Sequence, residues 1–195
     1  MNRLLISTAL MSEAVPLIDF YRMKKQPKQA HFHLYHAEFG SDRTNIELLV
    51  CGMGADNMRQ GLSAYFTAFD NTDRTKHLNL GIAGALYEPI GKLLWAESIA
   101  DTRIGLPKDV RNSSSYTVRS LPEASYHYQP GVLFDMEAES WLQCIAENTQ
   151  QFAPDDLFCA KVVSDNQNEN GHKIDPHWVR NIVRQNIEEL DKHIK

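Results

Sequence analysis

Short apolar runs typical of strands alternate along this chain with segments of helical periodicity, and this alternation constrains the fold more than any other feature. The sequence predicts strands at residues 3–9, 31–39, 45–51, 77–80, 93–99, 132–134 and 157–163. It predicts helices after Ser12, a plausible N-cap, and at residues 57–69, 136–148 and 177–194. Strands that alternate with helices form largely parallel sheets covered on both faces, so we expect an α/β domain.

The regular pattern stops between residues 101 and 130, where serines, prolines and scattered charges dominate. We expect a long irregular insertion there. The rest of the chain has no repeat, low-complexity tract or linker, and 195 residues suit one domain. The sequence therefore predicts a single domain over residues 1–195.

Composition excludes several classes of protein. The formal net charge is −5, which argues against a protein that mainly binds nucleic acid. No apolar run approaches the roughly 20 residues that span a bilayer, so we expect no membrane segment. The three cysteines, Cys51, Cys144 and Cys159, are far apart and odd in number. They predict free thiols and a cytoplasmic location.

Candidate functional residues follow the predicted strands. In sheets of this type, ligands bind beyond the carboxyl ends of the strands. Five such junctions are residues 10–13, 52–54, 81–84, 135–137 and 164–166. Three of them carry carboxylates and two are rich in glycine, so we expect the site at this edge of the sheet.

The order of these junctions matches a known pattern. The motifs are Ala9-Leu10-Met11-Ser12-Glu13, Gly52-Met53-Gly54, Asn79-Leu80-Gly81-Ile82-Ala83-Gly84, Asp135-Met136-Glu137-Ala138 and Val163-Ser164-Asp165. With them the chain resembles the nucleoside phosphorylase superfamily, and most of all the methylthioadenosine/S-adenosylhomocysteine nucleosidases. The resemblance covers nearly the whole chain apart from the irregular stretch after residue 101.

The resemblance implies a three-layer α/β/α fold with a mixed, mainly parallel central sheet. It also implies hydrolysis of the N-glycosidic bond of a purine nucleoside or a related compound, without a metal or an organic cofactor. Members of the family are dimers or larger assemblies that share pocket residues across an interface, so a homo-oligomer is expected. The expected partner is a small nucleoside substrate.

Cleavage of this bond passes through a ribose that is cationic at its anomeric carbon, so the enzyme must hold the sugar, activate water and assist the departing base. By resemblance, Glu13 activates the water. Glu137 accepts hydrogen bonds from the ribose hydroxyls, and Met136 packs against the sugar. Asp165 protonates a purine ring nitrogen or forms a hydrogen bond with it, and an acid at neutral pH needs a raised pKa.

Four further residues are expected to shape the substrate site by resemblance: Gly54, Gly81, Ile82 and Ala83. Glycine allows the backbone to turn tightly and to approach a ligand closely. Each of the three acids also has a purely structural interpretation. Glu13 and Glu137 suit helix starts, where the helix dipole favours a carboxylate, and Asp165 suits the cap of a turn.

Two other functions stay open from the sequence. One is a phosphate-dependent phosphorylase, although residues 9–13 contain neither the arginine nor the glycine of a phosphate loop, which favours hydrolysis. The other is a catalytically weakened, nucleoside-binding member. Ile82 stands where nucleosidases usually have serine, and Lys161 replaces a common arginine. In the shortened region before the Met-Glu motif, only residues 126–128 offer aromatic surface for a base.

Three histidines invite a metal interpretation, because His31, His33 and His36 lie close together on one predicted strand. A zinc site needs three or four convergent ligands, and His36 falls on the opposite face from the other two. We therefore expect a solvated strand and no metal site.

Overall fold

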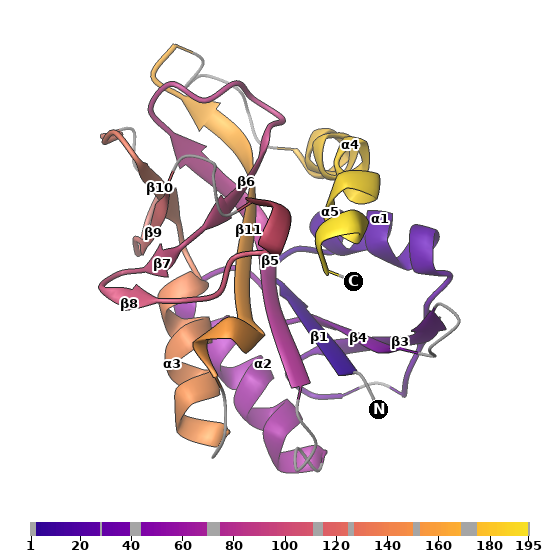
Figure 1. Ribbon diagram of the computed structural model, residues 1–195. Coiled ribbons are helices and arrows are strands. Elements are labelled where there is room, and N and C mark those ends of the chain that lie inside the picture. The colour runs from indigo at the N-terminus through magenta and orange to yellow at the C-terminus, as the bar shows by residue number, and fades with distance from the viewer. Residues whose placement is uncertain are drawn as a thin grey trace.

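The structure, a computed structural model, shows three layers: a central sheet with helices on both faces (Figure 1). It describes residues 3–27, 29–39, 44–69, 75–110, 115–124, 127–149, 153–168 and 175–194. The α/β/α fold with its mixed sheet, predicted from the alternation and the resemblance, is confirmed.

The strands are β1 (Arg3–Thr8), β2 (Lys24–Lys25), β3 (His33–Phe39), β4 (Thr44–Val50), β5 (Thr75–Ala85), β6 (Leu93–Ala96), β7 (Ser98–Ile99), β8 (Thr102–Arg103), β9 (Thr117–Ser120), β10 (Val132–Asp135) and β11 (Leu157–Asn166). The helices are α1 (Met11–Tyr21), α2 (Ala55–Ala68), α3 (Ala138–Asn148), α4 (Pro176–Gln185) and α5 (Ile187–Ile194), with 3-10 turns η1 (Lys108–Val110) and η2 (Pro154–Asp156).

Strand β5 is the centre of the sheet. It pairs in parallel with β1 on one side and with β11 on the other, and β1 continues in parallel to β4. Near its carboxyl end, β5 also meets β10, where Gly84 pairs antiparallel with Phe134. The ends of β1, β5, β10 and β11 therefore converge in one region, which positions the candidate site.

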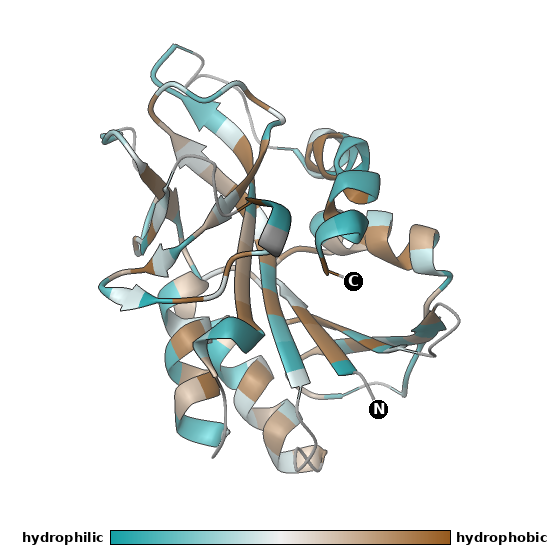
Figure 2. Cartoon of the chain, in the orientation of Figure 1, coloured by the Kyte–Doolittle hydropathy of each residue, from teal (hydrophilic) through white to brown (hydrophobic). Residues whose placement is uncertain are grey.

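Two apolar clusters join the layers. Helices α2 and α3 pack on one face of the sheet through residues such as Tyr65 and Trp141, both fully buried. Helices α1, α4 and α5 cover the other face through residues such as Leu17, Val183 and Leu190. In Figure 2, β1 and the middle of β11 are mostly hydrophobic, as expected for strands buried on both faces.

Helix α1 and the C-terminal helical segment differ from the prediction in ways that have a clear cause. Helix α1 begins at Met11 with Leu10 at its N-cap, because the carboxylate of Glu13 accepts the N–H of Leu10. The segment 177–194 forms two helices rather than one. At the break, the side-chain amide of Asn186 donates to the carbonyls of Ile182 and Gly91, and thus favours a turn over a continuing helix.

Part of the interval predicted to be irregular is regular. Residues 101–130 contain β8, η1 and β9, and β9 lies between β10 and β7 in parallel with both. Val118 of β9 is fully buried. Four residues are too few to show a strand period, so tertiary pairing decides the conformation of this segment.

The structure also bears on the cysteines and on membrane-spanning helices. Cys51, Cys144 and Cys159 are all free and buried. Among the described residues, no helix has the length and apolar character needed to cross a membrane.

Candidate active site

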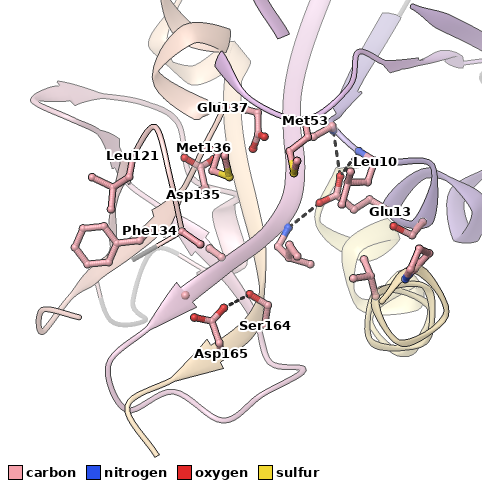
Figure 3. A pocket seen from close by; sticks show the side chains of 18 of the residues that line it. Leu10, Glu13, Met53, Leu121, Phe134, Asp135, Met136, Glu137, Ser164 and Asp165 are labelled. Atoms are coloured by element: carbon pink, nitrogen blue, oxygen red, sulfur yellow. Dashed lines mark hydrogen bonds between the residues drawn. The ribbon is translucent and has the colours of Figure 1, made fainter. Parts of the chain in front are cut away.

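Three acidic side chains that lie far apart in the sequence line one cavity of about 480 Å³: Glu13, Glu137 and Asp165. The cavity lies where β1, β5, β10 and β11 end, and Figure 3 shows the three side chains around it. Its other lining residues are Ala9, Leu10, Met11, Ser12, Met53, Ile82, Ala83, Gly84, Leu121, Glu123, Ala124, Phe134, Asp135, Met136, Ser164, Asp175, Pro176 and Val179. Distant strand ends therefore build a single hollow.

The carboxylate of Glu13, in the first turn of α1, is held by three backbone donors. Its Oε2 accepts the N–H groups of Ala9 (3.1 Å) and Leu10 (2.8 Å). Its Oε1 accepts the N–H of Ile82 on β5 at 3.1 Å. Burial raises the pKa of Glu13 to about 7, although the backbone donors and the charge of Lys161 oppose the shift. Near neutral pH, Glu13 can therefore both hold and release a proton.

Glu137 lies between β10 and α3, and a distant loop holds its side chain. Its Oε1 accepts the N–H of Gly54 at 2.6 Å. Gly54 has φ +92° and ψ 161°, a region that is essentially restricted to glycine. Burial raises the pKa of Glu137, and the charge of Lys161 opposes that shift. Gly54 thus fixes the orientation of Glu137 relative to the cavity.

A buried cation, Lys161 of β11, lies next to the cavity. Its Nζ is 2.6 Å from Oδ2 of Asp135 and 2.6 Å from Oδ1 of Asn79. The side chains of Lys161 and Asp135 are only 2% and 1% exposed. Burial acts to lower the pKa of Lys161, but the charge of Asp135 outweighs it and raises the pKa. Lys161 is therefore charged and offsets the negative charge of the acids.

Gly81 leaves room for this cation. A Cβ atom at Gly81 would lie 3.2 Å from Oε1 of Glu13 and 3.3 Å from Nζ of Lys161. Both contacts are tighter than ordinary van der Waals distance. The lack of a side chain at Gly81 therefore allows the acid and the cation to sit close to the β5 backbone.

Asp165 reaches the cavity through an irregularity in β11. The pairing with β5 shifts between Val163 and Asp165, so Ser164 is an extra residue in the ladder. Such a bulge changes the direction of the following side chain. The hydroxyl of Ser164 donates to Oδ1 of Asp165 (Figure 3), and the hydroxyl of Tyr128 donates to Oδ2. Both carboxylate oxygens are thereby held.

The other residues expected at the site fall into two groups. Met136, Ile82 and Ala83 line the cavity. Gly54 and Gly81 are not among the described lining residues. The N–H of Gly54 donates to Glu137, and Gly81 leaves space for the side chains of Glu13 and Lys161.

Sequence reasoning missed two features of the site. The first is the ion pair of Lys161 with Asp135. A lysine inside the apolar run 157–163 was a signal that it needs a buried partner, but the partner itself could not be identified. The second is the start of α4, where Asp175, Pro176 and Val179 join the cavity wall. No local pattern indicates that contact.

The structure places His33 and His36 on β3 and His31 just before it. Among the described residues, no three or more histidine, cysteine, aspartate or glutamate side chains are grouped to hold a metal ion. The acids of the cavity are instead held by backbone N–H groups, hydroxyls and one lysine.

Comparisons with known proteins give a structural likeness. No protein-family model matches the chain, and no curated protein sequence matches it. Its structure is similar to that of Campylobacter jejuni 5′-methylthioadenosine/S-adenosyl homocysteine nucleosidase, with a TM-score of 0.73 and 16% identity over 100% of this chain and 99% of that chain. It is also similar to Helicobacter pylori futalosine hydrolase, with a TM-score of 0.74 and 13% identity over 99% and 97%.

A plant protein gives a similar result. The chain matches Arabidopsis thaliana 5′-methylthioadenosine nucleosidase with a TM-score of 0.71 and 15% identity, covering 100% of this chain and 95% of that chain. At these identities the likeness establishes the fold. The activity of this chain has to be argued from its own cavity.

Proposed function

We propose that this chain hydrolyses the N-glycosidic bond of a purine nucleoside or a related compound. One observation carries the proposal: Glu13, Glu137 and Asp165 line a single cavity of about 480 Å³, at the carboxyl ends of the central strands. A volume of this order accommodates a small organic ligand. The structural likeness to nucleosidases supports the same reaction.

Glu13 would act as the general base that activates water. An ionised carboxylate has about four lone-pair positions, and the three backbone N–H groups occupy three of them. One position at Oε1 is left to accept a proton from water. A pKa of about 7 suits this role, because a general base works best when its pKa lies near the operating pH.

Glu137 and Asp165 would act on the two ends of the nucleoside. Glu137 accepts backbone N–H groups from Gly54 and Met136, and a carboxylate with about four lone-pair positions can still accept the ribose hydroxyls, while the side chain of Met136 packs against the sugar. Asp165, held by two hydroxyls, would form the hydrogen bond to the ring nitrogen of the departing base. The negative charges of the site also stabilise the cationic sugar in the transition state.

The charge of the cavity favours water over phosphate as the nucleophile. All charged side chains among its described lining residues are acidic: Glu13, Glu123, Asp135, Glu137, Asp165 and Asp175. Lys161 is close, but Asp135 and Asn79 engage its ammonium group. A phosphate dianion would meet repulsion there, so phosphorolysis is the less favoured candidate.

We also propose that the protein is a cytoplasmic homodimer or larger homo-oligomer. Free, buried cysteines suit a reducing compartment. Met53 and Met11 at the cavity are 59% and 38% exposed, and a second copy would cover such apolar surface. Light scattering coupled to size exclusion measures the mass directly, and a monomer at micromolar concentration contradicts the oligomer.

The function is tested by incubating the protein with a panel of purine nucleosides, including 5′-methylthioadenosine, with and without phosphate. We expect free base to appear at equal rates in both buffers. Glu137→Gln and Asp165→Asn should each lower kcat by at least about 100-fold, since each removes a transition-state interaction. The control is Glu147→Gln on the exposed face of α3, which should leave the rate unchanged.

Three results would contradict this proposal. Base release that requires phosphate supports the phosphorylase instead. Tight binding of a nucleoside without turnover supports a weakened binding protein. Full activity in a folded Glu137→Gln variant removes the proposed role of that residue.

A backbone prediction follows from Gly54. Alanine there meets no atom within 4 Å, so the effect is purely conformational. We expect Gly54→Ala to destabilise the fold by about 1–3 kcal/mol in urea unfolding, and to raise KM as the N–H leaves Glu137. Gly131→Ala is the matched control, because Gly131 also has a positive φ (72°) but lies outside the described cavity lining. Gly131→Ala should lose stability with an unchanged KM. An equal rise in KM in Gly54→Ala and Gly131→Ala would contradict the role of Gly54 in holding Glu137.

A further inference from the structure

Tyr128 contacts the acid that the mechanism above assigns to the departing base. The hydroxyl of Tyr128 donates to Oδ2 of Asp165, which lines the cavity. Tyr128 itself is not among the described lining residues. Tyr128 therefore holds the acid from outside the cavity wall. We infer that Tyr128 is a positioning residue, which acts through Asp165 on the departure of the base. This inference rests on the proposed function.

The backbone is arranged to permit the contact. A Cβ atom on Gly84 would lie 2.8 Å from both Oδ2 of Asp165 and Cε1 of Tyr128, distances at which atoms clash. Gly84 is also the point where β5 pairs with β10 on one side and with β11 on the other. The missing side chain at this junction makes room for a tyrosine and a carboxylate together.

The two hydroxyl donors constrain the carboxylate from both sides. Ser164 donates its one hydroxyl hydrogen to Oδ1, and Tyr128 donates its own to Oδ2. The carboxyl plane of Asp165 is thereby fixed, and each oxygen keeps a lone pair for another donor. A ring N–H of the departing base is such a donor. Without Tyr128, Oδ2 loses its partner, and of the two hydroxyl donors only Ser164, at Oδ1, still restrains rotation of the carboxyl group.

The sequence predicted a different role for residues 126–128. Residues 126–128 were the expected aromatic surface for a base, and residue 126 lies outside the described part of the chain. The structure instead places the hydroxyl of Tyr128 on the acid. The hydroxyl of Tyr128, rather than the face of its ring, therefore contacts the site.

The test replaces Tyr128 with phenylalanine, which removes only the hydroxyl. For a purine nucleoside we expect kcat to fall about 10- to 100-fold with KM changed less than about threefold, as is typical when a partner that orients a functional side chain is lost. For a nitrophenyl riboside, whose leaving group departs without protonation, we expect less than about a threefold change. A merely structural role would lower both rates alike, and that result overturns the inference.

A second measurement does not depend on activity. In protein with ¹³C-labelled aspartate, the Asp165 carboxyl signal is assigned by its loss in Asp165→Asn. In Tyr128→Phe we expect the ¹³C chemical shift of this carboxyl group to change, because a hydrogen-bond donor to Oδ2 is gone. Tyr87→Phe, at an exposed position, should leave the chemical shift unchanged. An unchanged chemical shift in Tyr128→Phe overturns the inference. A wild-type protein that cleaves no nucleoside overturns the proposed function instead, and the chemical shift then decides the Tyr128 contact alone.

Discussion

Glu13→Gln is expected to lower kcat by about 10²- to 10⁴-fold, the usual contribution of a general base, with little change in KM. The amide cannot take a proton from water. Its oxygen can still accept the N–H groups of Ala9 and Leu10, but its NH₂ group then faces the N–H of Ile82. That unsatisfied pair should also destabilise the fold by about 1–3 kcal/mol, which urea unfolding measures.

The pH profile distinguishes a lost base from a damaged site. Since the pKa of Glu13 is about 7 and only the ionised form accepts a proton, kcat/KM of the wild type should rise with pH and level off above 7. At pH 5 it should be about one hundredth of the plateau, because the pH is then two units below that pKa. The residual activity of Glu13→Gln should lack this rise.

Glu123→Gln is the control for this prediction. Glu123 lines the same cavity but is exposed. We expect its pH profile to match the wild type and its rate to fall by less than about threefold, because this exposed charge is screened by solvent. An equal loss in Glu123→Gln, or an acid limb that persists in Glu13→Gln, would mean that Glu13 is not the base.

Lys161→Met is expected to destabilise the fold by about 3–5 kcal/mol. The substitution replaces lysine with an unbranched apolar side chain one atom shorter and leaves the buried carboxylate of Asp135 without its countercharge. It also removes a charge that stabilises ionised Glu13, so the acid limb of the pH profile should move to higher pH. Urea unfolding and the pH dependence of kcat/KM measure the two effects.

Two further variants test whether the loss of the countercharge of Asp135 causes the loss of stability. Arg59→Met breaks the exposed pair with Glu147, whose side chains are 44% and 46% exposed, and should change stability by less than about 1 kcal/mol. Lys161→Met combined with Asp135→Asn removes both buried charges and keeps an acceptor for the N–H of Ala138. It should recover much of the lost stability, and a double variant as unstable as Lys161→Met alone would refute the explanation.

The sequence predicted most helices and strands because the hydrophobic periodicity of an element, and the residues that begin and end it, lie close together in the chain. The strands β1, β4 and β11 and the helices α2 and α3 lie close to their predicted ranges. Their ends also identified Glu13, Glu137 and Asp165 as candidates, since side chains that follow parallel strands gather at one edge of a sheet. Where a competing side chain intervened, as Asn186 does between α4 and α5, the local pattern misplaced a boundary.

The sequence alone thus determined the layers, the edge of the sheet that carries the acids, and the excess of negative charge there. Tertiary structure decided how each acid is held. Lys161 meets Asp135 across β11 and β10, Gly54 reaches Glu137 from the loop before α2, and Tyr128 reaches Asp165 because Gly84 leaves space. These contacts join segments far apart in the chain and depend on a bulge, a positive φ and a missing side chain. Because sequence periodicity reports only on neighbours a few residues apart, it carries no information about such meetings.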